Sequence, residues 1–199
     1  MNTFFTADTH FGHANIIRYC KRPWILPSDL DEDGNWAVDK EVVHLRAKAM
    51  DNDLINIWNL TVTNEDTVFF LGDFCMGSAG KYLNRLNFKN FYFVMGNHDK
   101  DLCLFERYTQ RVTPLGKRHT VKNFGNLSEV IVEGQSIILC HYAMRVWSMS
   151  HHGSWHLFGH SHGTLPDDPR SKSLDVGVDV HNYRPIDFHE VSTYMSKKD

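Results

Sequence analysis

Eight side chains of the types that bind divalent metal ions follow short apolar runs of this chain. They are Asp8, His10, Asp73, Asn97, His98, His141, His160 and His162. Carboxylate, amide and imidazole donors without a thiolate suit Mn, Fe, Zn or Ni, whereas structural zinc sites are rich in cysteine. Eight candidates are too many for one tetrahedral ion. Two ions about 3.5–4 Å apart that share a carboxylate would use them well, so the set predicts a dinuclear metal site.

Two pairs of these residues share a spacing of two, Asp8 with His10 and His160 with His162. In an extended segment, residues two apart point to the same side. Asp8 and His10 are therefore expected to reach one ion together, and His160 and His162 are expected to point at one site. An isolated Asp-x-His is more often a surface turn than a ligand pair, so the interpretation depends on partners elsewhere in the chain.

The segment Gly96-Asn97-His98-Asp99 is the richest in reactive side chains. The apolar run 91–95 leads into it, and Gly96 permits a sharp turn that a side chain would obstruct. A strand that ends in Asn-His-Asp presents these side chains at the rim of a sheet. On its own, a polar loop with a chance histidine explains the segment equally well.

Composition is that of an ordinary globular protein and favours a single domain over residues 1–199. Of the 199 residues, 42% are hydrophobic and 23% are charged. The formal net charge of −3 does not favour general nucleic-acid binding, whereas the 13 histidines direct attention to metal. The four cysteines lack a Cys-x-x-Cys spacing, which is typical of reduced thiols in a cytoplasmic protein. No signal peptide or membrane-spanning run is expected.

The first half of the chain reads as strands alternating with helices. Strands are predicted at 3–7, 67–71 and 91–95, with helices at 14–20, 38–60 and 81–86. The long helix is either continuous or broken near 51–53, and its charged residues are expected to face solvent. Such βαβ units indicate a mostly parallel sheet, in which ligands bind at the carboxyl ends of the strands. The candidate ligands of this half should therefore converge.

The second half is expected to continue as an antiparallel meander. Its predicted strands are 118–124, 129–133 and 136–140, with a tight hairpin turn at 133–135. Strands at 155–158 and 173–178 and a weak helix at 191–197 complete the prediction.

Together, the five groups resemble the calcineurin-like metallophosphoesterase superfamily. They occur in the order Asp-x-His, Gly-Asp, Gly-Asn-His-Asp, His and Gly-His-x-His, and they span residues 8–162. A chance match to all five in order is far less probable than a match to one. The resemblance implies an α/β fold, a four-layer α/β/β/α sandwich with two mixed β-sheets flanked by helices.

The resemblance also implies residue roles. The first metal would be held by Asp8, His10 and His162, the second by Asn97, His141 and His160, and Asp73 would bridge them. A hydroxide between the ions would attack phosphorus in line. His98 would act as the general acid for the leaving oxygen. Asp99 would orient His98 or support the ligands.

One part of the pattern departs from the protein phosphatases of this superfamily. They continue the second group as Gly-Asp-x-x-Asp-Arg-Gly, but this chain has Met76 and Gly77 where the Asp and Arg would be. The branch that hydrolyses diadenosine tetraphosphate shares that extension, so both resemblances are weakened. Arg18 and Arg145 are candidates to replace the missing phosphate-binding Arg, with surface salt bridges as the alternative role. His13 is a third candidate for substrate binding.

The pattern is closer to the small bacterial and phage phosphoesterases, which typically act on phosphodiesters. The expected substrate is therefore a small nucleotide or another phosphodiester, and Mn is the first expectation for the two metal ions, with Fe, Zn, Ni or Mg as alternatives. A phosphomonoesterase or a nuclease of the same superfamily is the alternative activity. A non-catalytic scaffold is disfavoured because the ligand set and His98 are complete. No membrane partner is expected, and the oligomeric state stays open.

Overall fold

The computed structural model describes residues 1–99, 111–112 and 118–199. Its first half contains β1 (Thr3–Thr6), α1 (Ala14–Tyr19), η1 (Pro27–Asp29), α2 (Lys40–Thr61), β2 (Thr67–Phe70), α3 (Ala79–Leu83) and β3 (Asn90–Phe93). The remainder contains β4 (Arg111–Val112), β5 (Arg118–Asn123), β6 (Leu127–Val132), β7 (Gln135–Cys140), η3 (Ser150–His152), β8 (Trp155–Phe158), β9 (Ser173–Asp175), η4 (Val178–Val180), β10 (Ile186–Asp187) and α4 (Phe188–Met195).

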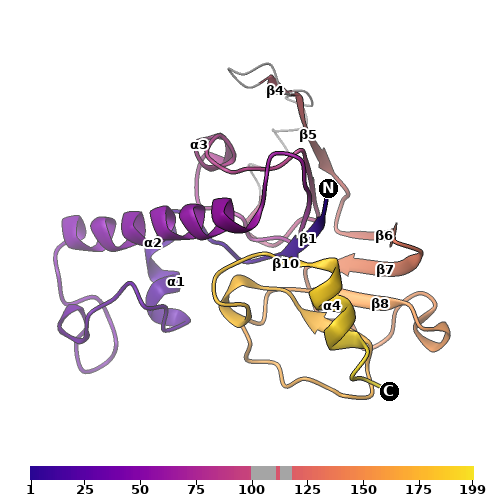
Figure 1. The fold of residues 1–199 in the computed structure, drawn as a ribbon. Coiled ribbons are helices and arrows are strands. Elements are labelled where there is room, and N and C mark those ends of the chain that lie inside the picture. Colours follow the sequence, from indigo (N-terminus) through magenta and orange to yellow (C-terminus); the bar gives the residue numbers. More distant parts are fainter. Residues whose placement is uncertain (100–110, 113–117) are drawn as a thin grey trace.

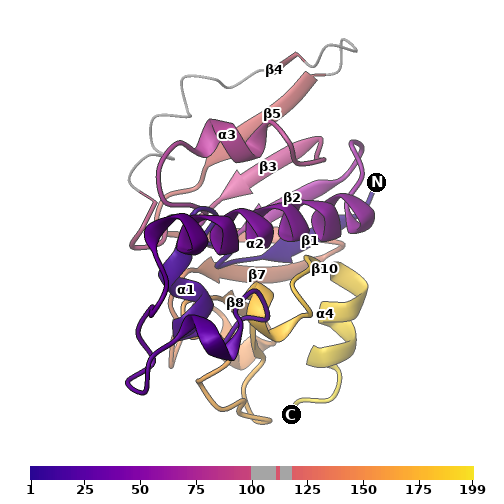
Figure 2. The ribbon, with the colours of Figure 1, turned by 90° about the vertical axis from the view of Figure 1, so that its left-hand side faces the viewer.

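The strands form two mixed sheets, as expected. The first has the order β10-β1-β2-β3-β5-β4, and its inner four strands are parallel. The second has the order β6-β7-β8-β9. Figure 1 shows α1 and α2 on one side of the strands, with β6, β7 and β8 on the other. Figure 2 looks onto the first sheet from the helix side, where β5, β3, β2 and β1 follow one another behind α2 and α3.

The expected antiparallel meander is wrong in two respects. β5 belongs to the first sheet and pairs in parallel with β3, and in the second sheet only the β6–β7 hairpin is antiparallel. β8 runs parallel to both β7 and β9. The long segments that precede β8 and β9 allow these parallel pairings, because a parallel neighbour requires a crossover connection. As a result, the carboxyl ends of β7 and β8 lie at the same edge of their sheet.

Alternation along the strands explains how two cores form. Phe4, Phe70 and Phe91 belong to the core between the first sheet and the helices α1 to α3. Phe5 and Phe69, one position away, belong to the core between the two sheets, which α4 also enters. Successive side chains of a strand point to opposite faces, so each aromatic run supplies both cores.

Helix α2 is continuous through the predicted break and is capped by Asp39, which accepts a hydrogen bond from the Val42 amide at 3.0 Å. One of its charged residues corrects the expectation of a solvated face. Asp51 is buried, accepting from the amide of Gly12 at 2.8 Å and the hydroxyl of Tyr82 at 3.0 Å. The Asp51 carboxylate therefore anchors the segment that follows His10. In the part of the chain that the structure describes, no helix has the length and apolar character needed to cross a membrane.

Candidate metal centre

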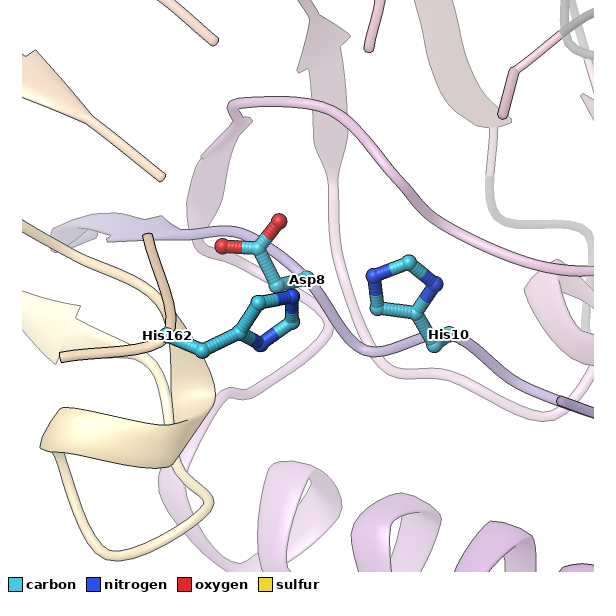
Figure 3. A group of neighbouring side chains, drawn as sticks. All are labelled: Asp8, His10 and His162. Atoms are coloured by element: carbon cyan, nitrogen blue, oxygen red, sulfur yellow. The ribbon is translucent and has the colours of Figure 1, made fainter. Parts of the chain in front are cut away.

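One group of candidate ligands lies where the N-terminal strand meets the loop after β8. The ligand atoms of Asp8, His10 and His162 all lie within 4.8 Å of one another. Figure 3 shows the two side chains of the N-terminal segment beside the one contributed by the later loop. The Asp8 carboxylate and the His10 ring are buried, and His162 is half-buried. The prediction that these three residues can reach one ion agrees with this geometry.

The backbone that brings them together is not the extended segment predicted from the spacing of two. β1 ends at Thr6, and Asp8 and His10 have φ of 60° and 49°. His160 and His162 repeat this pattern with φ of 68° and 47°. These values lie in the left-handed region, which side chains other than Gly adopt at a cost. Strained backbone at both Asp-x-His and His-x-His turns is a feature found preferentially at functional sites.

A second group contains Asp73, His141 and His160, whose ligand atoms also lie within 4.8 Å of one another. Asn97 belongs beside it, because its Oδ1 is 3.2 Å from Nε2 of His141. The Nδ1 of His141 is 2.8 Å from the carbonyl oxygen of Leu71, to which it can donate. Nε2 is then left with its lone pair facing the cluster. Four residues, Asp73, Asn97, His141 and His160, therefore meet at the carboxyl ends of β2, β3, β7 and β8.

Asp73 lies between the two groups. Its Oδ2 is 3.5 Å from Nε2 of His10 and 3.5 Å from Nε2 of His141. Its other oxygen, Oδ1, accepts a hydrogen bond from the His98 amide at 2.9 Å. One carboxylate oxygen is thus fixed by backbone, and the other is presented to both sets of imidazoles.

Asp8 is held in the same way. Its Oδ2 accepts from the His160 amide at 2.8 Å. Its Oδ1 and Nε2 of His10 are buried and have no hydrogen-bond partner among the described residues. In a metal-free site, burying these two atoms without a hydrogen-bond partner would cost free energy of folding. Because both are ligand types for divalent transition metals, these residues fit a metal ion.

The pKa shifts of three of these residues, Asp8, His10 and Asp73, agree with that fit. Burial raises the pKa of Asp8 to about 7, so its negative charge needs a compensating cation. Burial lowers the pKa of His10 to about 2, which leaves this imidazole neutral with a lone pair available. Burial opposes ionisation of Asp73, but the proximity of His141 and the hydrogen bond from the His98 amide outweigh it and lower the pKa to about 2. The centre is thus supplied with a carboxylate and a neutral imidazole at neutral pH.

His98 and His13 border this cluster. The side chain of His98 is 38% exposed, and its Nε2 lies 4.0 Å from Oδ2 of Asp73. The His13 ring lies 5.4 Å from the ring of His10 and 6.0 Å from that of His98. Both imidazoles are therefore close to the candidate ligands, and His98 is open to solvent.

The contacts of Asp99 differ from those expected of a residue that orients the His98 ring. Its carboxylate accepts hydrogen bonds from the amides of Asp73 at 2.7 Å, Phe74 at 2.8 Å and Gly96 at 2.7 Å. The side chain is buried and joins the Gly-Asp loop to the Gly-Asn-His-Asp loop. Of its two predicted roles, support of the ligand loops agrees with these contacts.

The two predicted arginines lie elsewhere. Nη1 of Arg18 donates to the carbonyl of Gly34 at 3.0 Å and to the side chain of Asn35 at 3.1 Å, so this guanidinium is engaged by the following loop. Arg145 is exposed and borders a cavity of about 930 Å³ together with Trp147 and Lys172. Among the described residues, none of the eight candidate ligands lines that cavity. The structure therefore does not bring Arg18 or Arg145 to the cluster.

Two neighbours of the cluster were missed by the sequence prediction. The ring of Tyr142 packs edge-on against His160 with centroids 4.7 Å apart, and its hydroxyl is 3.4 Å from Oδ1 of Asn97. Its position directly after His141 was an available signal. Arg22, which is fully buried, donates to the backbone carbonyls of Asp8 and Thr9. Nothing in the local pattern distinguishes this arginine from a surface residue.

Comparison with known proteins agrees with this architecture. The chain is 29% identical to an uncharacterised protein of Methanocaldococcus jannaschii over 98% of this chain and 91% of the relative. It is 24% identical to the gene 66 protein of Mycobacterium phage D29, covering 94% and 92% of the two chains. A solved structure, a protein of unknown function from Aquifex aeolicus, shares the fold with a TM-score of 0.64 at 20% identity, covering 96% of this chain and 98% of that one.

Comparison with a family model identifies the protein family. The model of the calcineurin-like phosphoesterases matches residues 1–190, which include all of the candidate ligands. Members of this family hydrolyse phosphoric esters with the help of metal ions. The chain therefore belongs to the calcineurin-like phosphoesterase family and is a metal-dependent phosphoesterase.

Proposed function

We propose that the protein is a dinuclear-metal-dependent phosphodiesterase that hydrolyses a small nucleotide or another phosphodiester. The observation that carries the proposal is the position of Asp73, whose Oδ2 is 3.5 Å from imidazole nitrogens of both ligand groups. A carboxylate oxygen between two such groups suits a bridging ligand. Asp8, His10 and His162 hold one ion, Asn97, His141 and His160 hold the other, and Mn²⁺ is the first candidate for both.

The bound ions would lower the pKa of a water molecule for attack on phosphorus and neutralise charge on the phosphoryl oxygens. The protein groups supply orientation and a proton. The backbone amides of His98 and His160 fix one oxygen each of Asp73 and Asp8. His98 is exposed beside Asp73 and donates the proton that the leaving oxygen requires. Asp99 maintains the loops that carry Asp73 and His98.

The preference for a diester is supported by the two arginines that follow the Asp8–His10 segment, Arg18 and Arg22. Arg18 is engaged by Gly34 and Asn35, and Arg22 is buried in an ion pair with Asp179. Neither guanidinium is available to a phosphate. A phosphodiester carries one negative charge at neutral pH, whereas a phosphomonoester carries nearly two. The diester therefore needs less positive charge from protein side chains, and the described side chains around this site are imidazoles rather than guanidinium groups. Arg18 is therefore not part of the proposed substrate site, and Arg145 is also left out because it borders a cavity that none of the described candidate ligands lines.

A metal-reconstitution panel tests the proposal. The metal-stripped protein receives Mn²⁺, Ni²⁺, Zn²⁺ or Mg²⁺ separately and is assayed with bis-p-nitrophenyl phosphate, p-nitrophenyl phosphate, 2′,3′-cyclic nucleotides and short oligonucleotides. We expect the highest kcat/KM for a diester with Mn²⁺ and two ions bound per chain. Faster turnover of the monoester would contradict the diesterase assignment. Binding of a single ion at full activity would contradict the dinuclear one.

A further inference from the structure

A buried arginine lies behind the Asp8–His10–His162 group. The side chain of Arg22 is 0% exposed and that of its partner Asp179 is 7% exposed. The pairing is bidentate, with Nε 2.8 Å from Oδ1 and Nη2 2.7 Å from Oδ2 of Asp179. Two parallel charge-assisted hydrogen bonds fix the relative orientation of the two groups. The pair joins the loop after α1 to the 3₁₀ turn η4.

The other donors of Arg22 hold the N-terminal ligand turn. Nη2 donates to the carbonyl of Asp8 at 2.7 Å, and Nη1 donates to the carbonyl of Thr9 at 3.0 Å. Nη1 also lies 3.4 Å from the sulfur of Met50, so all five N–H groups of the guanidinium have a partner. These carbonyls belong to the turn in which Asp8 and His10 have positive φ. Arg22 thereby stabilises a backbone conformation that costs free energy by itself.

The carboxylate of the pair reaches the third ligand. Oδ2 of Asp179 lies 2.7 Å from Nδ1 of His162. A carboxylate accepts a hydrogen bond from this nitrogen, so Nδ1 carries the hydrogen and Nε2 keeps its lone pair. The hydrogen bonds from the Asp8 carbonyl through Arg22 and Asp179 to His162 therefore form one connected path. It links ligand segments that are 152 to 154 residues apart in sequence.

We infer that Arg22 and Asp179 are positioning residues for the metal ion held by Asp8, His10 and His162. This inference rests on the proposed dinuclear function. The pair orients His162 so that Nε2 faces the ion, and it keeps the Asp8 turn in the left-handed conformation that directs the carboxylate toward the same point. Neither residue touches the Asp73–His141–His160 group in the described contacts, so its action is confined to one of the two sites.

Asp179 and His162 also belong to a second cluster that could bind a metal ion, which would make Asp179 a ligand rather than a positioning residue. Ligand atoms of Cys20, His162 and Asp179 also lie within 4.8 Å of one another. A cation that accepts thiolate, imidazole and carboxylate ligands, such as Zn²⁺, could in principle use this triad in place of the Asp8 group. The guanidinium of Arg22, however, is already bonded to both oxygens of Asp179, and a second cation on the same carboxylate would be repelled. The positive charge of Arg22 therefore favours a positioning role for Asp179 over a role as metal ligand.

The chain offers a matched control pair. Arg46 binds Asp29 through Nε at 2.7 Å and Nη2 at 3.2 Å, and the Asp29 side chain is 5% exposed. Asp29 also accepts from the Leu26 amide at 2.8 Å, so it resembles Asp179 in burial and in its number of partners. None of these contacts involves a candidate ligand. The Arg46 side chain is 29% exposed, so loss of this pair reports the effect of breaking a partly buried ion pair without altering the metal centre.

Calorimetric titration of the metal-free protein with Mn²⁺ tests the inference. We expect Asp179→Asn and Arg22→Lys to weaken one of the two Mn²⁺ sites by about 10- to 100-fold and to leave the other unchanged, as when the partner of a ligating histidine is removed. Lysine cannot reproduce the fork of five donors, so Arg22→Lys should not be silent. Asp29→Asn should leave both sites intact. Unchanged affinities in Asp179→Asn, or equal weakening of both sites, would overturn the inference.

The same data separate this inference from the proposed function. If the unmodified protein binds fewer than two Mn²⁺ ions, the dinuclear proposal itself fails. If it binds two ions and hydrolyses diesters while Asp179→Asn is indistinguishable from it, only the positioning role fails.

Nuclear magnetic resonance of the unmodified protein avoids any loss of folding in the variants. With two Zn²⁺ ions bound, the ¹⁵N shifts of His162 are expected to show a protonated Nδ1 and a metal-bound Nε2. Metal on Nδ1, accompanied by loss of one ion in Cys20→Ser, would instead show that the Cys20 triad is the binding site and would overturn the inference.

Discussion

The backbone amide of His98 donates a 2.9 Å hydrogen bond to Oδ1 of Asp73. This bond joins the Gly-Asp and Gly-Asn-His-Asp segments and fixes the carboxylate so that Oδ2 faces His10 and His141. His98 therefore contributes to the centre in two ways. Its main chain orients the proposed bridging ligand, while its exposed ring is available to a substrate.

Asp73→Asn tests the bridging role. The amide has the same shape but lacks the charge that two neighbouring cations require. We expect kcat/KM for bis-p-nitrophenyl phosphate to fall on the order of 10²–10³-fold or more, because electrostatic stabilisation is lost at the reacting phosphate. Metal content measured by mass spectrometry should fall below two ions per chain. Retention of both ions and of activity would show that Asp73 does not bridge.

His98→Ala separates the ring of His98 from its backbone. The substitution keeps the amide that binds Asp73, so both metal ions are expected to remain. The rate should fall by about 10²–10⁴-fold for a poor leaving group because proton donation is lost. The loss should be smallest for p-nitrophenolate, which departs without a proton. A comparison of kcat across aryl phosphodiesters with leaving groups of different pKa measures this dependence, and an equal loss for all of them would reject the general-acid role.

Gly96→Ala tests the close approach of the two loops. A Cβ at this position would lie 2.2 Å from Oδ1 and 2.5 Å from the amide nitrogen of Asp73. Since such contacts are far shorter than van der Waals distances, Asp73 must move, and we expect metal affinity and activity to fall together. Gly34→Ala is the control, because its Cβ meets nothing within 4 Å although its φ is +76°. Backbone strain alone should therefore reduce stability there without reducing metal content measured after dialysis.

Asp66→Asn gives a pH-dependent prediction that is independent of the metal centre. Burial disfavours the charged carboxylate, but hydrogen bonds from the Asn2 amide and from Thr63 outweigh it, so the pKa of Asp66 is lowered. A lowered folded-state pKa means that the charged form stabilises the fold above the unfolded value of about 3.9, and that this contribution is lost as pH falls through the folded value.

At pH 7 we expect Asp66→Asn to lower the free energy of unfolding by about 1–3 kcal/mol, because one of the two carboxylate oxygens becomes an NH₂ group and the donors that face it lose their acceptor. The difference from the unmodified protein should narrow as pH falls below about 4. Urea denaturation of the metal-free protein at pH 7 and at pH 3.5 measures it. A difference that stays constant across this range would contradict the assigned cause.

The candidate ligands and most of the strands could be predicted from the sequence. The apolar runs before Asp8, Asp73 and Asn97 indicate strands, and the structure has β1, β2 and β3 there. β8 begins and ends at the predicted bounds, 155–158. These features depend on a few neighbouring residues, because a buried strand needs only a short apolar run and a motif needs only its own spacing.

The tertiary structure alone decided how those segments meet. The convergence of Asp8 with His10 was predicted from an extended backbone, but it arises from a left-handed turn that Arg22 stabilises from a separate loop. The pairing of β5 with β3, the burial of Asp51 and the link from Asp179 to His162 all join residues far apart in the chain. Such contacts depend on the folded arrangement of both sheets, so local sequence determines which side chains can bind metal, and long-range packing determines which of them share an ion.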